Sequence, residues 1–352
     1  MSFRPNAILV HCESLALKGQ VMPPKKIWIA VLVCTVLAGL AVPVASAAPN
    51  QSRIERVVAE GPTRSAAYVY SAAMRKTIKV QILTPSSQTR TAATTSRPTL
   101  YMLGGLGEED PNNSIWLLKT DIVKFFANKN VNVVLPIAGN GSFYTDWRHD
   151  DPVLGRYRWE TFLTRELPPL LAERFGANGS RAIAGLSMGA GSALVLAARH
   201  PRFYRSAASF SGCYSASDVA GQISARSIIN GFGGNADNMW GPIGDPDWAA
   251  HDVVRQAAGL RGTDVYVSVG SGLPGRYDAP GYPGNDNPAD RVVVGGAIEI
   301  GSLACTRALQ STLAAQRIPA QFRFTNPGTH SWPYWVDQLH FSWPVIARAL
   351  NR

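Results

Sequence analysis

One short segment, Gly185-Leu186-Ser187-Met188-Gly189, has the residue types and spacing of a nucleophilic serine on a tight turn. It follows a short apolar run and precedes a stretch rich in Ala and Leu, which predicts a strand, a turn and a helix. The glycines on both sides of Ser187 allow a strained turn and close packing around it. The start of the helix would direct free amides and the positive end of its dipole at developing negative charge. The segment therefore predicts that Ser187 is a nucleophile.

A nucleophilic serine needs a base, and His330 has the position of one. In α/β-hydrolases the base lies in a loop after the last strand of the sheet. His330 follows a predicted strand at 322–325 and a loop at 326–329. The other histidines beyond residue 47 lie at a helix end, within a helix or beside aspartates in predicted solvated turns: His200, His340, His149 and His251. His330 is therefore the predicted base.

The acid that orients this base should lie between Ser187 and His330. That interval contains one glutamate, Glu299, and several aspartates. Asp278 is the main rival, because it follows a predicted strand at 265–269, where many hydrolases place the acid. The remaining candidates lie in Gly/Pro/Asn contexts typical of turns: Asp237, Asp245 and Asp247. The residue pattern alone leaves Glu299 and Asp278 equally favoured.

An oxyanion hole needs two amides, one from the residue after the nucleophile and one from an earlier loop. Met188 supplies the first position. The second falls in the glycine-rich segment 104–107, which follows a predicted strand at 99–103. Leu106 is the predicted second donor, although such a segment is also typical of a simple glycine turn.

The elements that must position these residues alternate between apolar strands and helices, which predicts an α/β fold with a largely parallel sheet. The chain shows no internal repeat and no linker, so residues 48–352 are expected to form a single domain. The predicted strands are 54–59, 66–70, 77–83, 99–103, 131–135, 182–185, 207–210, 265–269 and 322–325. The predicted helices are 115–128, 161–175, 188–199, 304–317 and 331–350, with a surface loop at 86–98 and an irregular stretch at 213–262.

Residues 22–47 have the pattern of a secretory signal peptide. Lys25 and Lys26 precede an apolar run at 27–42, and Ala45-Ser46-Ala47 is a small-x-small cleavage pattern. A membrane anchor is the alternative, but the run is shorter than the ~20 residues of a spanning helix. We expect Met22 to be the true start, residues 1–47 to be a leader, and the mature chain to be exported without a transmembrane helix.

The composition excludes a disordered chain, because 46% of the 352 residues are hydrophobic and only 16% are charged. The leader holds four basic residues and one acidic residue, so its removal lowers the formal charge from +10 to +7. The basic residues are scattered, which argues against nucleic acid as a partner and suggests retention near an anionic envelope. No His/Asp/Glu cluster has metal-ligand spacing, so neither a metal nor another cofactor is expected.

Beyond the leader the sequence contains two cysteines, Cys213 and Cys305. Two cysteines in an exported protein suggest one disulfide, and two unpaired buried thiols are the alternative.

Five motifs occur in an order that resembles the secreted mycolyltransferases, the antigen 85 group, and more closely their corynebacterial-type relatives. The resemblance covers residues 66–350 and implies an α/β-hydrolase fold. It implies transfer of mycolic acid between trehalose molecules or onto cell-wall arabinogalactan. The motifs are Ser-Phe-Tyr-Thr-Asp-Trp at 142–147, Trp-Glu-Thr-Phe-Leu-Thr at 159–164, Gly-Leu-Ser-Met at 185–188, Asn-Met-Trp-Gly-Pro at 238–242 and Gly-Thr-His-Ser-Trp at 328–332.

The resemblance also assigns roles to individual residues. The acid of the family lies just before a helix, as Glu299 does before the predicted helix at 304–317, and this favours Glu299 over Asp278. The implied site has Ser187 as nucleophile, Glu299 as acid and His330 as base, with Leu106 and Met188 as oxyanion donors. Trp332 would border the sugar site, Asn113 is a further candidate for substrate binding, and Cys213 would pair with Cys305.

The implied partners are trehalose mycolates and arabinogalactan, and we expect a monomer in the cell wall. One departure affects the sugar site: antigen 85 members have Asp-Gly-Leu-Arg at the first oxyanion loop, whereas Gly104 and Gly107 stand here. Glu108-Glu109-Asp110 could compensate. Two rival functions stay open, a secreted carboxylesterase of the same fold and a non-catalytic wall-binding protein.

Overall fold

The structure is a computed structural model, and it describes residues 51–86, 96–107, 110–137, 139–282, 287 and 289–352. From Gln51 onward the described residues form one compact unit. The predicted leader, most of the predicted loop at 86–98, and Glu108 and Glu109 lie outside the described residues.

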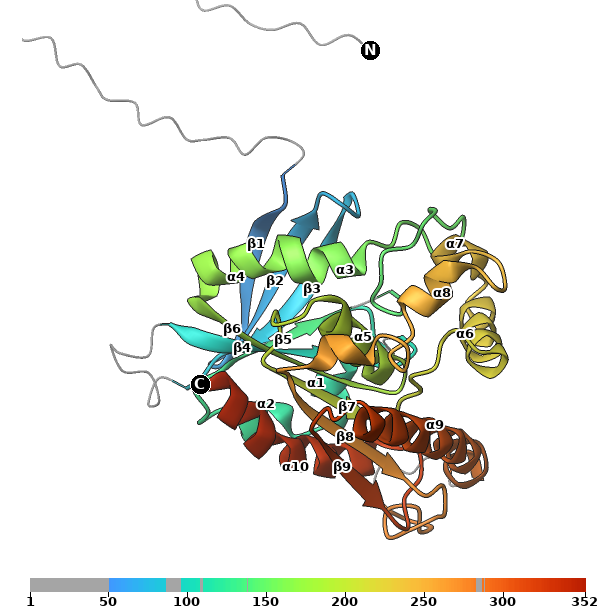
Figure 1. Ribbon diagram of the computed structural model, residues 1–352. Coiled ribbons are helices and arrows are strands. Elements are labelled where there is room, and N and C mark those ends of the chain that lie inside the picture. Colours follow the sequence, from blue (N-terminus) through green and yellow to red (C-terminus); the bar gives the residue numbers. More distant parts are fainter. Residues whose placement is uncertain (1–50, 87–95, 108–109, 138, 283–286, 288) are drawn as a thin grey trace, which may run out of the picture. The chain divides into compact units, whose positions relative to one another are not determined.

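The unit is built on a nine-stranded sheet (Figure 1). At one edge lie three antiparallel strands, β1 (Arg53–Gly61), β2 (Arg64–Ser71) and β3 (Lys76–Leu83). Six mutually parallel strands follow across the sheet: β5 (Asn132–Pro136), β4 (Arg97–Leu103), β6 (Ala177–Leu186), β7 (Ser206–Phe210), β8 (Asp264–Gly270) and β9 (Ala320–Thr325). Every residue of β4, β5 and β7 is buried, as expected for parallel strands covered on both faces. The predicted α/β fold with a mostly parallel sheet is confirmed.

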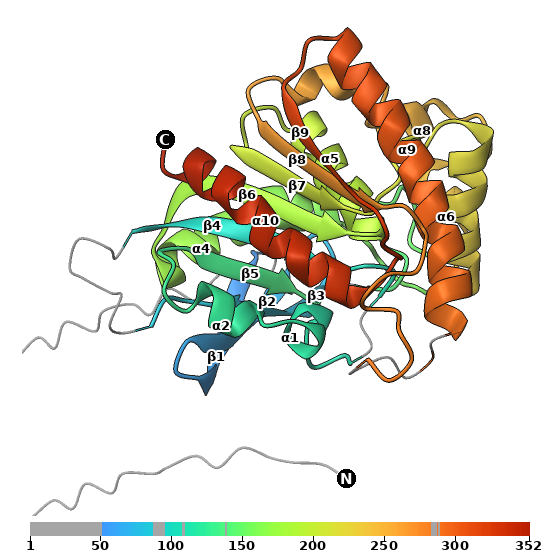
Figure 2. The same ribbon diagram turned by 90° about the horizontal axis from the view of Figure 1, so that it is seen from below.

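Helices cover both faces of the sheet (Figures 1 and 2). On one face lie α1 (Ile115–Lys119), α2 (Ile122–Phe126) and α10 (Trp332–Leu350). On the other lie α3 (Trp159–Thr161), α4 (Leu167–Phe175), α5 (Met188–Arg199) and α9 (Gly295–Ala315). Each face has its own apolar core: Trp116 and Leu339 belong to the first, and Trp159 and Leu194 to the second.

Two predicted helices are present in altered form. The one expected at 115–128 is divided into α1 and α2 at Thr120, whose hydroxyl donates to the carbonyl of Trp116 and accepts the amide of Ile122. The one expected at 161–175 begins at Trp159 and contains a π-helical turn at Phe162–Glu166, directly before α4. Its two prolines, Pro168 and Pro169, directly follow this π-helical turn.

The prediction of an irregular stretch at 213–262 is wrong. This stretch contains α6 (Val219–Gly231), α7 (Asp237–Trp240), α8 (Pro246–Ala250) and a 3-10 turn at Ala257–Leu260. Asp218 caps α6 by accepting the amide of Gly221, and Asp245 caps α8 by accepting the amide of Asp247. These capping residues were the local signal for helices.

The helix predicted at 304–317 starts much earlier. A π-helical turn at Asp290–Val294 leads directly into α9. The glycines at the start of α9 hide the helical spacing of its apolar residues. One of them, Gly296, is required by packing, because a Cβ there would lie 2.8 Å from the carbonyl oxygen of Gly272. Among the described residues, Asp290–Ala315 is the one helical stretch long and apolar enough to cross a membrane by length and composition. Its residues Leu309 and Leu313 are buried in the core.

Candidate active site

Ser187 stands on a strained turn between β6 and α5, with φ 52° and ψ −121°. The flanking glycines are required by packing, because a Cβ on Gly185 would lie 2.2 Å from the carbonyl oxygen of Gly189. A Cβ on Gly189 would lie 2.2 Å from the carbonyl oxygen of Gly104. The Ser187 amide donates to the carbonyl of Phe210 at 2.9 Å, which fixes the turn to β7. The local fold thus holds the backbone of Ser187 in a conformation that residues other than glycine rarely adopt.

His330 lies in the loop after β9 and connects two of the predicted residues. Its Nε2 is 3.0 Å from Ser187 Oγ, and its Nδ1 is 2.7 Å from Glu299 Oε2. Its amide donates to the carbonyl of Gly295 at 3.2 Å, and its ring meets the Trp335 ring edge to face at 4.8 Å. The three side chains therefore form the hydrogen-bonded chain that acyl-transfer chemistry on serine needs.

Glu299 is almost fully buried, at 1% exposure. Its Oε1 accepts the hydroxyl of Ser211 at 2.7 Å and the amide of Gly270. Trp335 Nε1 donates to the same Ser211 hydroxyl at 3.0 Å. The expectation that Glu299 precedes a helix is wrong, since it lies within α9, but the helix holds it against His330.

Asp278, the rival acid, has a different place. It is 4% exposed, its Oδ1 accepts the Thr329 hydroxyl at 2.7 Å, and its Oδ2 accepts the Tyr334 hydroxyl at 2.7 Å. The Gly275 amide donates to the same Oδ2 at 2.8 Å. Burial and the Asp278 carboxylate both raise the pKa of Tyr334. Asp278 thus ties residues on both sides of His330 in place.

The glycine-rich segment 104–107 lies against the nucleophile. A Cβ on Gly105 would lie 3.7 Å from the Cβ of Ser187, and the Gly104 amide donates to the Tyr144 hydroxyl at 2.8 Å. Met188 is the first residue of α5, so its amide has no partner within the helix. Within the described part of the chain, neither the Met188 nor the Leu106 amide has a hydrogen-bond acceptor. Both amides are free to receive a ligand oxygen.

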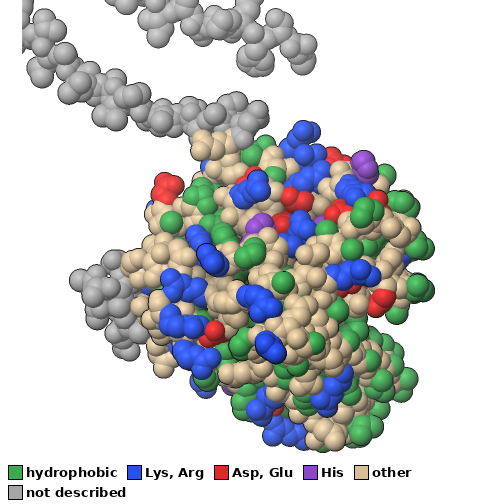
Figure 3. Space-filling model, in the orientation of Figure 1, with side chains coloured by type: hydrophobic (Ala, Val, Ile, Leu, Met, Phe, Trp, Pro, Cys, Tyr) green, Lys and Arg blue, Asp and Glu red, His purple; other side chains and the backbone are tan. Residues whose placement is uncertain are grey.

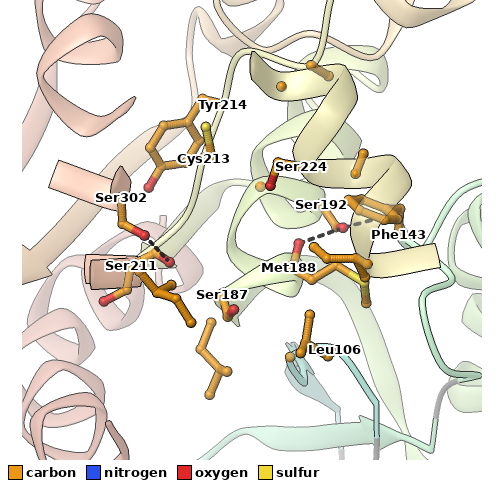
Figure 4. A pocket seen from close by; sticks show the side chains of 18 of the residues that line it. Leu106, Phe143, Ser187, Met188, Ser192, Ser211, Cys213, Tyr214, Ser224 and Ser302 are labelled. Carbon is orange, nitrogen blue, oxygen red and sulfur yellow. Dashed lines mark hydrogen bonds between the residues drawn. The ribbon is translucent and has the colours of Figure 1, made fainter. Parts of the chain in front are cut away.

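A cavity of about 540 Å³ opens beside Ser187, between α5, α6 and α9 (Figure 4). Ser187 lies between Leu106 and Met188 on one side and Ser211 on the other. The wall is mostly apolar, with serines along α6 such as Ser224. Other apolar lining residues are Ile115, Phe143, Val195, Ile228, Ile298 and Trp335. Such a wall suits an aliphatic chain.

The predicted disulfide between Cys213 and Cys305 is confirmed. Cys213 follows β7 and lines the cavity, whereas Cys305 lies on α9 six residues after Glu299. The bridge therefore ties the cavity wall to the helix that carries the candidate acid.

The two predicted substrate-binding residues differ in position. Trp332 lines the cavity and meets Trp116 and Trp335 edge to face at 5.5 and 5.2 Å. Asn113 is not among the lining residues; its side chain accepts from Gln81 at 3.1 Å and donates to Asp110 at 2.6 Å. Trp332 therefore lies at the site, whereas Asn113 is hydrogen-bonded to Gln81 and Asp110 and does not line the cavity.

The other histidines do not reach Ser187. His149 is exposed, His340 contacts Asp121 at 3.0 Å, and His200 contacts Glu160 at 2.7 Å. The expectation that His251 lies in a solvated turn is wrong: it is 4% exposed and stacks on Trp240 at 4.5 Å.

The remaining aspartates of the interval have structural contacts. Asp237 pairs with Arg226, and Asp245 and Asp247 pair with Arg148. Among the described residues, no three His, Cys, Asp or Glu side chains are grouped so that they could hold a metal ion.

The fold and the arrangement around Ser187 define a protein of the α/β-hydrolase class. A family model described as "Putative esterase" matches residues 71–342. The sequence is 34% identical over 293 residues to the diacylglycerol acyltransferase/mycolyltransferase Ag85B of Mycobacterium intracellulare, covering 80% of this chain and 82% of that relative. It is also 34% identical over 292 residues to Ag85A of Mycobacterium tuberculosis, covering 80% of each chain.

The crystal structure of Mycobacterium tuberculosis MPT51 (FbpC1) matches with a TM-score of 0.66 and 26% identity, covering 80% of this chain and 97% of that one. The chain belongs to the esterase family and to the group of acyltransferases that includes the Ag85 mycolyltransferases. This membership supports an acyl-transfer enzyme.

Proposed function

We propose that this chain is an exported acyltransferase that moves mycoloyl groups from trehalose monomycolate to a second trehalose monomycolate or to cell-wall arabinogalactan. The observation that carries the proposal is the hydrogen-bonded chain from Glu299 through His330 to Ser187, beside an apolar cavity, in a relative of mycolyltransferases. In this proposal residues 1–47 are the leader that directs export to the cell wall.

In the first half-reaction Ser187 is the nucleophile and His330 the base. His330 Nε2 takes the proton of Ser187 Oγ while that oxygen attacks the carbonyl carbon of the mycolate ester. The Glu299 carboxylate accepts the hydrogen bond from Nδ1 and stabilises the imidazolium that forms. Ser211 and Gly270 hold that carboxylate in one orientation, so the ring stays aligned with the serine.

The former carbonyl oxygen becomes negative, and the amides of Leu106 and Met188 donate to it. When the ester C–O bond breaks, His330 gives its proton to the departing trehalose oxygen. The mycoloyl group remains on Ser187, with its aliphatic chain in the apolar cavity.

In the second half-reaction an acceptor hydroxyl replaces the departed trehalose. His330 takes its proton, the acceptor oxygen attacks the acyl carbon, and Ser187 recovers the proton as its bond to that carbon breaks. Water could take the place of the acceptor. The apolar side chains around the serine, among them Leu106, Trp332 and Trp335, limit its access.

The sugar subsite must differ from that of the antigen 85 group. A Cβ on Gly107 would lie 2.1 Å from Asn140 Oδ1, so a larger residue there requires Asn140 to move. Trp332 lines the cavity, and its ring and the ring of His330 both pack edge to face against Trp335. Trp332 is therefore the proposed sugar platform. We assign no substrate contact to Asn113.

The test incubates purified residues 48–352 with trehalose monomycolate and follows trehalose dimycolate against free mycolic acid. Dimycolate is the expected product. Free mycolic acid alone would make the protein an esterase, and neither product would favour a binding role.

The matched control compares two serines of the same cavity. Ser187→Ala should abolish transfer, whereas Ser224→Ala, on the α6 wall, should keep it. Transfer that survives in Ser187→Ala would refute the proposed nucleophile.

A further inference from the structure

The proposed oxyanion donor Leu106 lies in a segment, 104–107, whose other three residues are glycines. Glycine adopts a wider range of backbone conformations than any other residue, so this segment cannot fix its own shape. An oxyanion donor is effective only when it is aimed at the reacting oxygen before the reaction begins. The orientation of the Leu106 amide must therefore be imposed by contacts from outside the segment.

The turn at 141–144 supplies two such contacts. The amide of Gly104 donates to the Tyr144 hydroxyl at 2.8 Å, and the amide of Gly141 donates to the carbonyl of Leu106 at 2.8 Å. The peptide that carries the donor N–H of Leu106 thus lies between two peptides that are each hydrogen-bonded to this turn. The turn holds the oxyanion segment on both sides of the donor.

The turn has a strained backbone. Phe143 and Tyr144 have φ angles of 52° and 50°, and they are the one adjacent pair of non-glycine residues with positive φ in the described part of the chain. Strain of this kind persists only where the surrounding structure imposes it, and it is typical of functional sites. Phe143 lines the cavity, whereas Tyr144 is 1% exposed and packs edge to face on Trp159 at 5.9 Å. The turn therefore presents a buried hydroxyl in a fixed position to Gly104.

The same turn is linked to the helix that carries the second proposed donor. Ser192 Oγ lies 2.9 Å from the carbonyl oxygens of both Phe143 and Met188 (Figure 4). Met188 is the first residue of α5, and its amide is that second donor. One turn thus contacts the segments of both oxyanion donors.

We propose that Tyr144 is a positioning residue of the oxyanion hole: its hydroxyl fixes Gly104 and so keeps the Leu106 amide directed at the oxygen that becomes negative. The inference rests on the proposed function, because it takes the Leu106 amide as an oxyanion donor. Tyr144 is not among the residues that line the cavity, so it acts through the 104–107 segment and not on the substrate. Loss of its hydroxyl should weaken stabilisation of the developing charge without changing how the acyl chain binds.

Tyr144→Phe removes the hydroxyl and keeps the ring. Its matched control is Tyr204→Phe, because the Tyr204 hydroxyl is buried without a hydrogen-bond partner among the described residues. The two tyrosines are 1% and 0% exposed, so neither variant alters the outer surface, over which basic side chains are scattered (Figure 3).

Activity is measured on dissolved p-nitrophenyl butyrate and on its thionoester, in which sulfur replaces the carbonyl oxygen. Sulfur is a weak hydrogen-bond acceptor, so the thionoester depends less on the oxyanion amides than the oxygen ester does. The ratio of the two kcat values, oxygen ester to thionoester, therefore reports the contribution of the oxyanion hole.

In Tyr144→Phe, kcat on the oxygen ester should fall by about 10- to 100-fold, with KM within about twofold of the parent value. On the thionoester kcat should fall by at most about twofold, so the ratio should fall by about fivefold or more. Tyr204→Phe should keep both rates within about twofold. An unchanged ratio in Tyr144→Phe would overturn the proposal, because a merely structural role would lower both rates by the same factor.

Thermal unfolding shows whether Tyr144→Phe is folded. Ser192→Ala is the second variant, because it breaks the link between the turn and α5 without altering Tyr144. Its ratio of kcat values should fall by about threefold. If Tyr144→Phe does not fold, an unchanged ratio in Ser192→Ala would overturn the role of the turn.

The products made by the parent protein separate this inference from the proposed function. A parent that releases only free mycolic acid from trehalose monomycolate would refute the proposed transfer and leave the ratio as a test of Tyr144. An unchanged ratio in Tyr144→Phe, with a parent that forms dimycolate, would refute this inference alone.

Discussion

The Oδ1 of Asp278 accepts a 2.7 Å hydrogen bond from the hydroxyl of Thr329, the residue directly before His330. The Oδ2 of the same carboxylate accepts the hydroxyl of Tyr334, four residues after His330. A buried carboxylate that does not contact Ser187 or His330 thus fixes both sides of the segment that carries the proposed base.

Asp278→Asn is therefore expected to lower kcat by roughly 10- to 100-fold with little change in KM, because a small displacement of a reacting group is costly while the cavity is unaltered. Steady-state kinetics on a dissolved ester measures both constants, and thermal unfolding shows that the variant is folded. Asp337→Asn is the control, since Asp337 lies on the same helix as Tyr334 but pairs with Arg276. A change in kcat of twofold or less in Asp278→Asn would show that the hydrogen bonds of Asp278 to Thr329 and Tyr334 do not position His330.

Gly189→Ala tests the contact between α5 and the oxyanion loop. The added Cβ would lie 2.2 Å from the Gly104 carbonyl oxygen and 3.0 Å from the Leu103 side chain, so the loop must shift away from Ser187. We expect kcat to fall by about 10² to 10³, as on loss of an oxyanion donor. Gly231→Ala, whose Cβ would meet nothing within 4 Å, should leave kcat unchanged. Equal rates for both variants would contradict the assignment of the 104–107 segment.

Glu160 makes stability depend on pH. Burial opposes its ionisation, but the hydrogen bond from His200 and the charge of Arg199 outweigh burial and lower its pKa to about 2. In the unfolded chain the pKa of Glu is about 4.3. Because the folded value is the lower one, ionised Glu160 stabilises the fold above pH ~4.3, and this stabilisation is lost as the pH falls towards ~2.

Glu160→Gln should accordingly lower the free energy of unfolding near pH 7 by about 2–3 kcal/mol. The difference from the parent protein should shrink as the pH is lowered from about 4 to about 2, as urea unfolding would show. Glu173→Gln, at an exposed position of α4, should change stability by no more than about 0.5 kcal/mol. A difference that is constant over the whole pH range would contradict the role of Glu160.

Replacing both Cys213 and Cys305 by Ser removes a bridge that closes 92 residues. The chain-entropy model predicts a loss of about 4–5 kcal/mol in the free energy of unfolding. Denaturant unfolding of the double variant against the oxidised parent measures the loss. The reduced parent should behave like the double variant, and a parent whose stability is the same with and without reductant would disagree with this expectation.

The sequence was most informative where one local segment carries the chemistry. Ser187 has its strand, turn, helix and glycines within a few residues, and His330 follows a strand and a short loop. The local sequence does not separate Glu299 from Asp278, because both lie near glycines in weakly patterned segments. Their tertiary contacts distinguish them: Glu299, on α9, is hydrogen-bonded to His330, whereas Asp278 accepts hydrogen bonds from Thr329 and Tyr334.

The incorrect expectations for α6, for the start of α9 and for His251 also have structural causes. α6 was missed although Asp218 is a capping residue, because its exposed face mixes serines with aliphatic residues. The sequence pattern does not indicate the start of α9, because glycines stand there and one of them, Gly296, is required by close contact with Gly272. The burial of His251 depends on stacking with Trp240, a contact that no sequence spacing indicates.

In the proposed mechanism Ser187 carries the acyl group, and the mass of the acylated protein measures this most directly. The purified enzyme is mixed with a long-chain p-nitrophenyl ester, quenched in acid during the burst of p-nitrophenolate release, and mapped by peptide mass spectrometry. We predict one acyl group per chain, on the peptide that contains Ser187, and none in Ser187→Ala. An acyl group on another residue, or turnover by Ser187→Ala at the rate of the parent protein, would contradict the account.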